Sequence, residues 1–113
     1  MYLGLDLGTS GLKGIVIDDD QKVVAEASAP LTVSRPHDAW SEQAPADWIG
    51  AAEAVFAGLP RAALGSVKGI GLSGQQHGAT LLDAALNDTS TGTIWSVGAK
   101  SEPAICRANA PLK

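Results

Sequence analysis

Several features that would assign a protein class at once are scarce in this sequence. Its one cysteine, Cys106, excludes an internal disulfide and supplies no metal-ligand spacing. No apolar run reaches the roughly 18 to 20 residues that span a bilayer, and the amino terminus lacks the basic segment of a secretory signal. The eight basic residues are scattered and the net charge is -4, which disfavours nucleic acid as a partner. We therefore expect a cytoplasmic protein with no membrane and no nucleic-acid partner.

The composition that remains is that of a small globular domain. The chain has 113 residues, of which 45% are hydrophobic and 18% charged, enough apolar content for a packed core. Much of its glycine lies in two short stretches, residues 8–11 and 69–78. These two stretches hold most of the residues that suggest chemistry.

The first part of the chain predicts an antiparallel meander. Alternating and apolar stretches predict strands over residues 2–7, 12–17 and 22–28. The turns between them are too short for crossover helices. The acidic run Asp18–Asp20 is interpreted as a solvated hairpin turn, because three adjacent carboxylates do not all point one way.

A helix and two more strands follow a polar, proline-containing connection over residues 30–43. Pro45 is suited to the first turn of a helix, and Gly58 with Pro60 ends it. Its predicted apolar stripe consists of Trp48, Ile49, Ala52, Val55, Phe56 and Leu59. Strands are predicted over residues 67–73 and 79–82. The order β-β-β-α-β-β predicts an α/β fold, a mixed sheet with a helix packed on it. Residues 101–113 show no clear period.

The first candidate site is the glycine-rich turn after the first strand. Its residues are Asp6, Gly8, Thr9, Ser10, Gly11 and Lys13. Turn N–H groups and hydroxyls can donate to phosphate oxygens, and one carboxylate suits Mg²⁺, which keeps several waters. It is neither a P-loop nor a dinucleotide fingerprint, since a strand and not a helix follows. A plain hairpin with a solvated aspartate remains the alternative.

The second candidate site is the loop of residues 73–78, at the end of a strand, where ligands often bind. Its amides and the His77 imidazole offer donors and acceptors for sugar hydroxyls, although for His77 alone a polar turn with an exposed histidine is the better interpretation. No acidic residue adjoins His77, so substrate binding is favoured over catalysis. In the connection before the helix, Arg35 and His37 could contact anionic groups, and Trp40 is interpreted as a packing anchor.

These segments, in this order, resemble the FGGY carbohydrate kinases of the actin-like ATPase group, whose fold is ribonuclease H-like. Residues 2–13 look like the first phosphate motif of that group. Residues 31–37 with Trp40–Gln43 look like the linker of the xylulokinase branch, and residues 73–80 look like its sugar loop. The resemblance assigns residues 1–85 to the amino-terminal part of kinase domain I, an incomplete first domain, and leaves 86–113 as a divergent tail.

The resemblance implies ATP-dependent phosphorylation of D-xylulose at its 5-hydroxyl. It implies Mg²⁺ near Asp6, ATP phosphates on residues Gly8–Gly11 and Lys13, and the ketopentose on Gln76 and His77. The catalytic base and the adenosine motif of the family lie in segments that have no match here. We therefore expect an amino-terminal fragment that is inactive alone. Two alternatives remain. One is a non-catalytic binding module that pairs with a kinase partner or, as a homodimer, with a second copy. The other is a fragment of another sugar kinase or actin-like protein.

Overall fold

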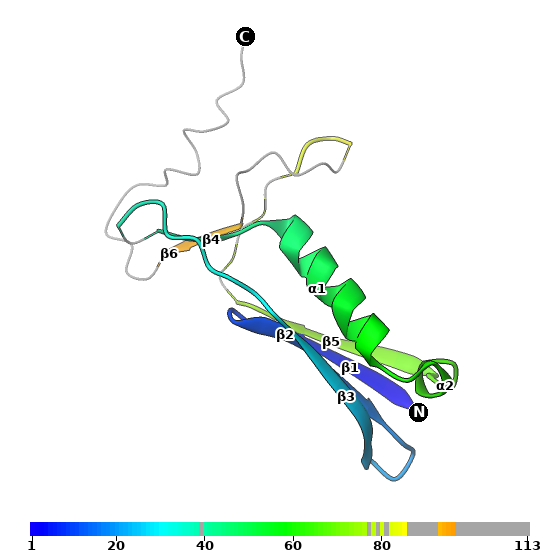
Figure 1. Ribbon diagram of the computed structural model, residues 1–113. Helices are drawn as coiled ribbons and strands as arrows, with labels where there is room; N and C mark the ends of the chain where they lie inside the picture. Colours follow the sequence, from blue (N-terminus) through cyan, green and yellow to red (C-terminus); the bar gives the residue numbers. More distant parts are fainter. Residues whose placement is uncertain (39, 77, 79, 81, 86–92, 97–113) are drawn as a thin grey trace.

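The computed structural model describes residues 1–38, 40–76, 78, 80, 82–85 and 93–96. Figure 1 shows the arrangement of its helices and strands. In chain order they are β1 (Tyr2–Leu7), β2 (Gly11–Ile17), β3 (Val23–Pro30), β4 (Trp40–Gln43), α1 (Pro45–Gly58), α2 (Arg61–Leu64), β5 (Gly69–Gly74) and β6 (Thr93–Ser96).

The main sheet has four strands in the order β3-β2-β1-β5. The predicted meander is confirmed: β1 pairs antiparallel with β2, and β2 pairs antiparallel with β3. β5 lies on the other side of β1 and runs parallel to it, and α1 is part of the crossover between the meander and β5 (Figure 1). Because β1 and β5 are parallel, their carboxyl ends lie at the same end of the sheet. The expected mixed α/β sheet is thereby confirmed.

The Asp18–Gln21 turn between β2 and β3 is organised by its first carboxylate. Asp18 Oδ1 accepts the backbone N–H groups of Asp20 and Lys22, each at 2.9 Å. This is the local side-chain bonding by which aspartate favours turns. Gln21 has a φ of 65°, in the left-handed region. The interpretation of the acidic run as a hairpin turn is confirmed.

Helix α1 packs on β2 and β3 through a narrower face than the sequence predicted. Ala51, Val55 and Leu59 are buried, whereas Ile49 is 64% exposed and Phe56 39% exposed. The predicted stripe was therefore wrong at these last two positions. The helix lies close to the sheet because its partners there are small: a Cβ on Gly14 would be 2.5 Å from Val55 Cγ1. Such an approach buries a narrow stripe and leaves the flanks of the helix outside the contact.

The core between α1 and the sheet is small and aliphatic. Its buried members are Leu3, Leu12, Val16, Ala29, Ala51, Val55, Leu59 and Ala63. Leu5 and Leu7 on the same face of β1 are partly buried against it, as the alternation predicted. No helix within the described ranges is long and apolar enough to cross a membrane.

Three elements were not predicted. Residues 40–43, expected to be part of a connection, form β4 because they pair antiparallel with β6 at Thr93–Ser96. Strand β6 lies in the segment 86–113 that the resemblance left as a divergent tail, and α2 is a helix of four residues. Of the strand expected over residues 79–82, residues 79 and 81 lie outside the described part of the chain.

Candidate functional site

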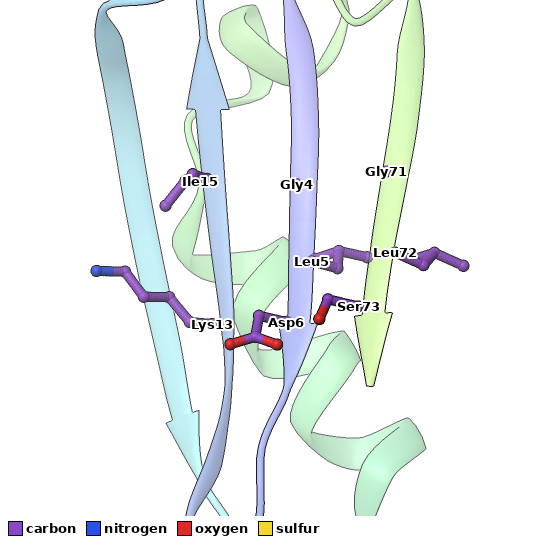
Figure 2. A pocket seen from close by; sticks show the side chains of 8 residues that line it. All are labelled: Gly4, Leu5, Asp6, Lys13, Ile15, Gly71, Leu72 and Ser73. Atoms are coloured by element: carbon purple, nitrogen blue, oxygen red, sulfur yellow. The ribbon is translucent and has the colours of Figure 1, made fainter. Parts of the chain in front are cut away.

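Asp6 lies near the carboxyl end of β1, with its side chain exposed on the face of the sheet away from α1. Its neighbours in the register are Lys13 on β2 and Ser73 on β5. These three side chains help to line an open cavity of about 450 Å³ (Figure 2). The Asp6 carboxylate, the predicted Mg²⁺ ligand, is therefore accessible beside the glycine-rich turn that follows β1.

The Lys13 ammonium is directed away from that turn. Its Nζ lies 2.9 Å from Glu26 Oε2 on β3, with both side chains more than half exposed. Figure 2 shows the Lys13 side chain extending away from Asp6. An exposed ion pair contributes little free energy. The Lys13 ammonium can therefore leave Glu26 for another anion at little cost. The structure places Lys13 next to the turn without placing its charge over it.

The turn from Gly8 to Gly11 is closed by backbone hydrogen bonds. The Gly8 N–H donates to the Gly11 carbonyl at 2.9 Å, and the Leu31 N–H donates to the Ser10 carbonyl at 3.0 Å. Gly11 is required for close approach, since a Cβ there would be 2.7 Å from the carbonyl oxygen of Ala29. The turn lines a second cavity of about 440 Å³, which also includes Asp6 and Lys13.

A third cavity, of about 220 Å³, lies where β1 and β5 end. Its lining residues are Leu7, Gln43, Trp48, Gly74, Gln75, Gly78 and Thr80. Gln76, the predicted sugar ligand, is exposed and is not among them, and His77 lies outside the described residues. Gln75 is the amide of this loop that faces the turn: the Thr9 hydroxyl donates to Gln75 Oε1 at 2.9 Å.

Gln43 is a polar residue at this site to which the sequence assigned no role of its own, whereas Gln75 is one of the two amides of the predicted sugar loop. Gln43 ends β4 and is buried, and its side-chain amide donates to the Thr9 carbonyl at 2.8 Å. Its position two residues before Pro45, in the stretch that also carries Trp40, is the sequence signal for it. The Arg35 and His37 side chains are exposed, and the rings of His37 and Trp40 meet edge-on at 4.9 Å. None of these three lines the cavities described above.

The comparisons with known proteins give one consistent result. The model of the N-terminal domain of the FGGY family of carbohydrate kinases matches residues 1–102. Xylulose kinase of Klebsiella pneumoniae is 46% identical over 103 residues, which are 90% of this chain and 21% of the relative. This chain therefore spans about a fifth of the length of that relative.

Solved structures share the fold. The structure of a xyloylose kinase from Brucella ovis superposes with a TM-score of 0.79 at 51% identity, over 82% of this chain and 20% of that one. A xylulose kinase from Rhodospirillum rubrum also gives a TM-score of 0.79, at 33% identity, over 96% of this chain and 24% of that one.

Proposed function

Because this chain belongs to the FGGY family of carbohydrate kinases, we propose that it supplies the phosphate turn and part of the sugar site for ATP-dependent phosphorylation of D-xylulose. In this proposal the donor phosphates bind the turn Gly8–Gly11. The donors are the N–H groups of Thr9 and Ser10 and the Ser10 hydroxyl, since the Thr9 hydroxyl already donates to Gln75. The pentulose binds at the loop that follows β5, with Gln76 and His77 as its ligands. The enzyme acts in the cytoplasm.

The observation that carries the proposal is the contact between the two loops. The Thr9–Gln75 hydrogen bond, at 2.9 Å, joins the phosphate turn to the sugar loop across the ends of β1 and β5. Phosphoryl transfer needs the donor phosphate and the acceptor hydroxyl side by side, since catalysis there is mostly positioning and charge neutralisation. Two loops in direct contact meet this requirement.

The residues around Asp6 fit a magnesium ion. Mg²⁺ is bound in phosphate-transfer sites by one or two carboxylates and keeps several waters. Asp6 offers one exposed carboxylate, and the cavity of about 440 Å³ that it shares with the turn leaves room for water and phosphate. Bound there, the ion would neutralise charge on the phosphates. Lys13 would add a positive charge after leaving Glu26.

Binding experiments on the 113-residue chain test the proposal. We expect ATP with Mg²⁺ to shift the backbone amide resonances of Thr9 and Ser10, and Asp6→Ala to weaken the Mg²⁺-dependent part of that binding. Saturation-transfer NMR should give a stronger response for D-xylulose than for glycerol or gluconate. Equal responses for the three compounds would contradict the proposed specificity for a pentulose. The absence of a shift at Thr9 and Ser10 would contradict phosphate binding at the turn.

We propose further that these residues alone do not turn over substrate. The chain spans about a fifth of the curated relatives, and the resemblance assigns the catalytic base to a segment outside these residues. A coupled assay of ADP release with D-xylulose should therefore give the same background for the chain and for Asp6→Ala. Turnover above that background would contradict this part of the proposal.

A further inference from the structure

Gln43 is a buried amide whose hydrogen-bonding groups are all engaged by the protein. It is 3% exposed. Its Nε2 donates to the Thr9 carbonyl at 2.8 Å and to the Thr32 carbonyl at 3.3 Å. Its Oε1 accepts the Trp48 indole N–H at 3.2 Å. A buried amide with both N–H groups and its oxygen in use has one orientation, so the Gln43 side chain is a fixed point next to the phosphate turn.

The bond to Thr9 also sets the direction of the next amide. A trans peptide is planar, and its C=O and N–H point in opposite directions. When Gln43 holds the Thr9 carbonyl, the N–H of Ser10 therefore points away from Gln43. Ser10 is exposed and lines the cavity of about 440 Å³ with Asp6. Within the described residues, the Ser10 N–H has no hydrogen-bond acceptor.

Two other carbonyls of the turn, those of Ser10 and Gly11, are engaged as well. The Ser10 carbonyl accepts from the Leu31 N–H and the Gly11 carbonyl from the Gly8 N–H. With Thr9, three consecutive carbonyl oxygens of the turn are bonded to protein donors. Among these three donors, Gln43 is the side chain, so it is the one that a substitution can remove while the backbone stays in place.

We propose that Gln43 is a positioning residue for the phosphate turn: its amide holds the Thr9–Ser10 peptide so that the Ser10 N–H is presented to a phosphate oxygen. The inference rests on the proposed function of the turn. Without the donor, the Thr9 carbonyl would lack a partner and the peptide would rotate to find one. An oxygen lone pair would then face the phosphate in place of an N–H.

The test compares two variants with inorganic tripolyphosphate as the probe, with and without Mg²⁺. Gln43→Met keeps the length of the side chain and adds no charge, but it removes both donors. Val55→Ala lowers stability by removing core packing and leaves the contacts of the turn unchanged, so it is the control for destabilisation. Binding is followed by calorimetry and by the Ser10 amide resonance, and folding by the dispersion of the remaining amide resonances.

The inference predicts that Gln43→Met, while folded, binds tripolyphosphate about tenfold more weakly or worse, as expected for losing a hydrogen bond to a charged group. Val55→Ala should bind as the wild type does. Equal affinity of folded Gln43→Met and wild type would overturn the inference and leave the proposed function standing. Absence of binding by the wild type would overturn the proposed function, and the inference with it.

A second measurement needs no ligand. A scalar coupling across the hydrogen bond, from Gln43 Nε2 to the Thr9 carbonyl carbon, is expected in the wild type. The Thr9 carbonyl resonance should shift in Gln43→Met more than in Val55→Ala. A wild type without the coupling, and with a Thr9 carbonyl that does not respond to Gln43→Met, would overturn the inference whether or not phosphate binds.

Discussion

At the scale of single residues, Gly14 is the position where helix α1 comes closest to the sheet. A Cβ there would be 2.5 Å from Val55 Cγ1 and 3.3 Å from Leu5 Cδ2. We expect Gly14→Ala to lower the free energy of unfolding by about 1 to 3 kcal/mol, because an extra methyl in a packed core forces a shift of the helix or of Val55. Chemical denaturation followed by circular dichroism measures the change.

Gly50 provides the matched control for this substitution. It lies in α1 and is exposed, and a Cβ at this position would meet nothing within 4 Å. Gly50→Ala should raise the free energy of unfolding by about 0.5 to 1 kcal/mol, since alanine loses less backbone entropy in a helix. The same chemical change thus has opposite signs at the two sites. A loss of stability in both variants would contradict this description of the helix contact.

Asp19 and Lys68 form an exposed ion pair at the amino-terminal end of β1, with Nζ and Oδ2 3.1 Å apart. The hydrogen bond and then the charge of Lys68, followed by the charge of the terminal amine, hold the pKa of Asp19 below its ordinary value of 3.8. Lys68→Met should therefore raise that pKa, as measured by an NMR titration of the Asp19 carboxyl carbon. An unchanged pKa would contradict the ion pair.

The sign of the pH effect follows from the direction of this shift. The pKa of Asp19 is lower in the folded state than its ordinary value of 3.8. The ion pair therefore stabilises the folded state in full above pH 3.8. This stabilisation is lost as the pH falls through the lowered pKa of the folded state. Both side chains are largely exposed to solvent, so salt should screen the interaction. The difference in pKa between wild type and Lys68→Met should narrow at high ionic strength.

At the scale of elements, helix α1 begins without a side-chain cap. Ala44 occupies the N-cap with extended φ and ψ and makes no capping hydrogen bond. Ala44→Asp would supply a side-chain acceptor for N–H groups of the first turn and a negative charge at the positive end of the helix. We expect the free energy of unfolding to rise by about 0.5 to 2 kcal/mol, measured by denaturation.

The control adds the same charge to the other end of the helix. Ala57 is exposed in the last turn of α1, where the helix dipole disfavours a negative side chain. Ala57→Asp should therefore lower stability. If both variants changed stability by the same amount, net charge and not the cap would be the cause, and the capping prediction would be wrong.

Local patterns predicted the elements whose cause is local. Alternation located β1, an apolar run located β2, and Pro45 with Gly58 marked both ends of α1. Strands β4 and β6 were missed because each is stabilised by the other across a long separation: Trp40 pairs with Ser96 and Gln43 with Thr93. The exposure of Ile49 was missed because it depends on how closely α1 approaches Gly14.

In the candidate site too, the sequence predicted the local features and missed the contacts between distant residues. The turn at Gly8–Gly11 was predicted because its glycines and hydroxyls are adjacent in sequence. The bonds that hold the turn were not, since Gln43 reaches Thr9 across 34 positions and Gln75 across 66. The roles of Asp6, Lys13 and Gln76 remain predictions, and so does the domain boundary at residue 85.

At the scale of the whole molecule, the parallel pairing of β1 with β5 determines where ligands can meet. Asp6 and Ser73 are register partners across this pair. The turn after β1 and the loop after β5 therefore begin side by side, at the same end of the two strands. The meander on the other side of β1 supplies Gly11 and Leu31, which close the turn. One half of the sheet therefore shapes the phosphate turn, and the other half supplies the loop proposed to bind the sugar.

Strand β5 is an edge of the described sheet and carries the most exposed large apolar side chains on it. Leu72 is 80% exposed and Ile70 is 60% exposed, and Figure 2 shows the Leu72 side chain extending outward from β5. An edge strand of this kind offers unpaired N–H and C=O groups together with apolar surface, which favours pairing with another chain. We therefore expect the 113-residue chain to associate with a second copy of itself through β5 as concentration rises.

Leu72→Lys tests this association, because a charge on an exposed edge disfavours strand pairing and removes little packing from an already exposed position. Sedimentation velocity over a range of concentrations should show a wild-type dimer that is weakened in Leu72→Lys. Ile49→Lys is the matched control, since Ile49 is 64% exposed on α1 and lies in no strand. A wild type that stays monomeric throughout, or equal weakening by both variants, would exclude association through β5.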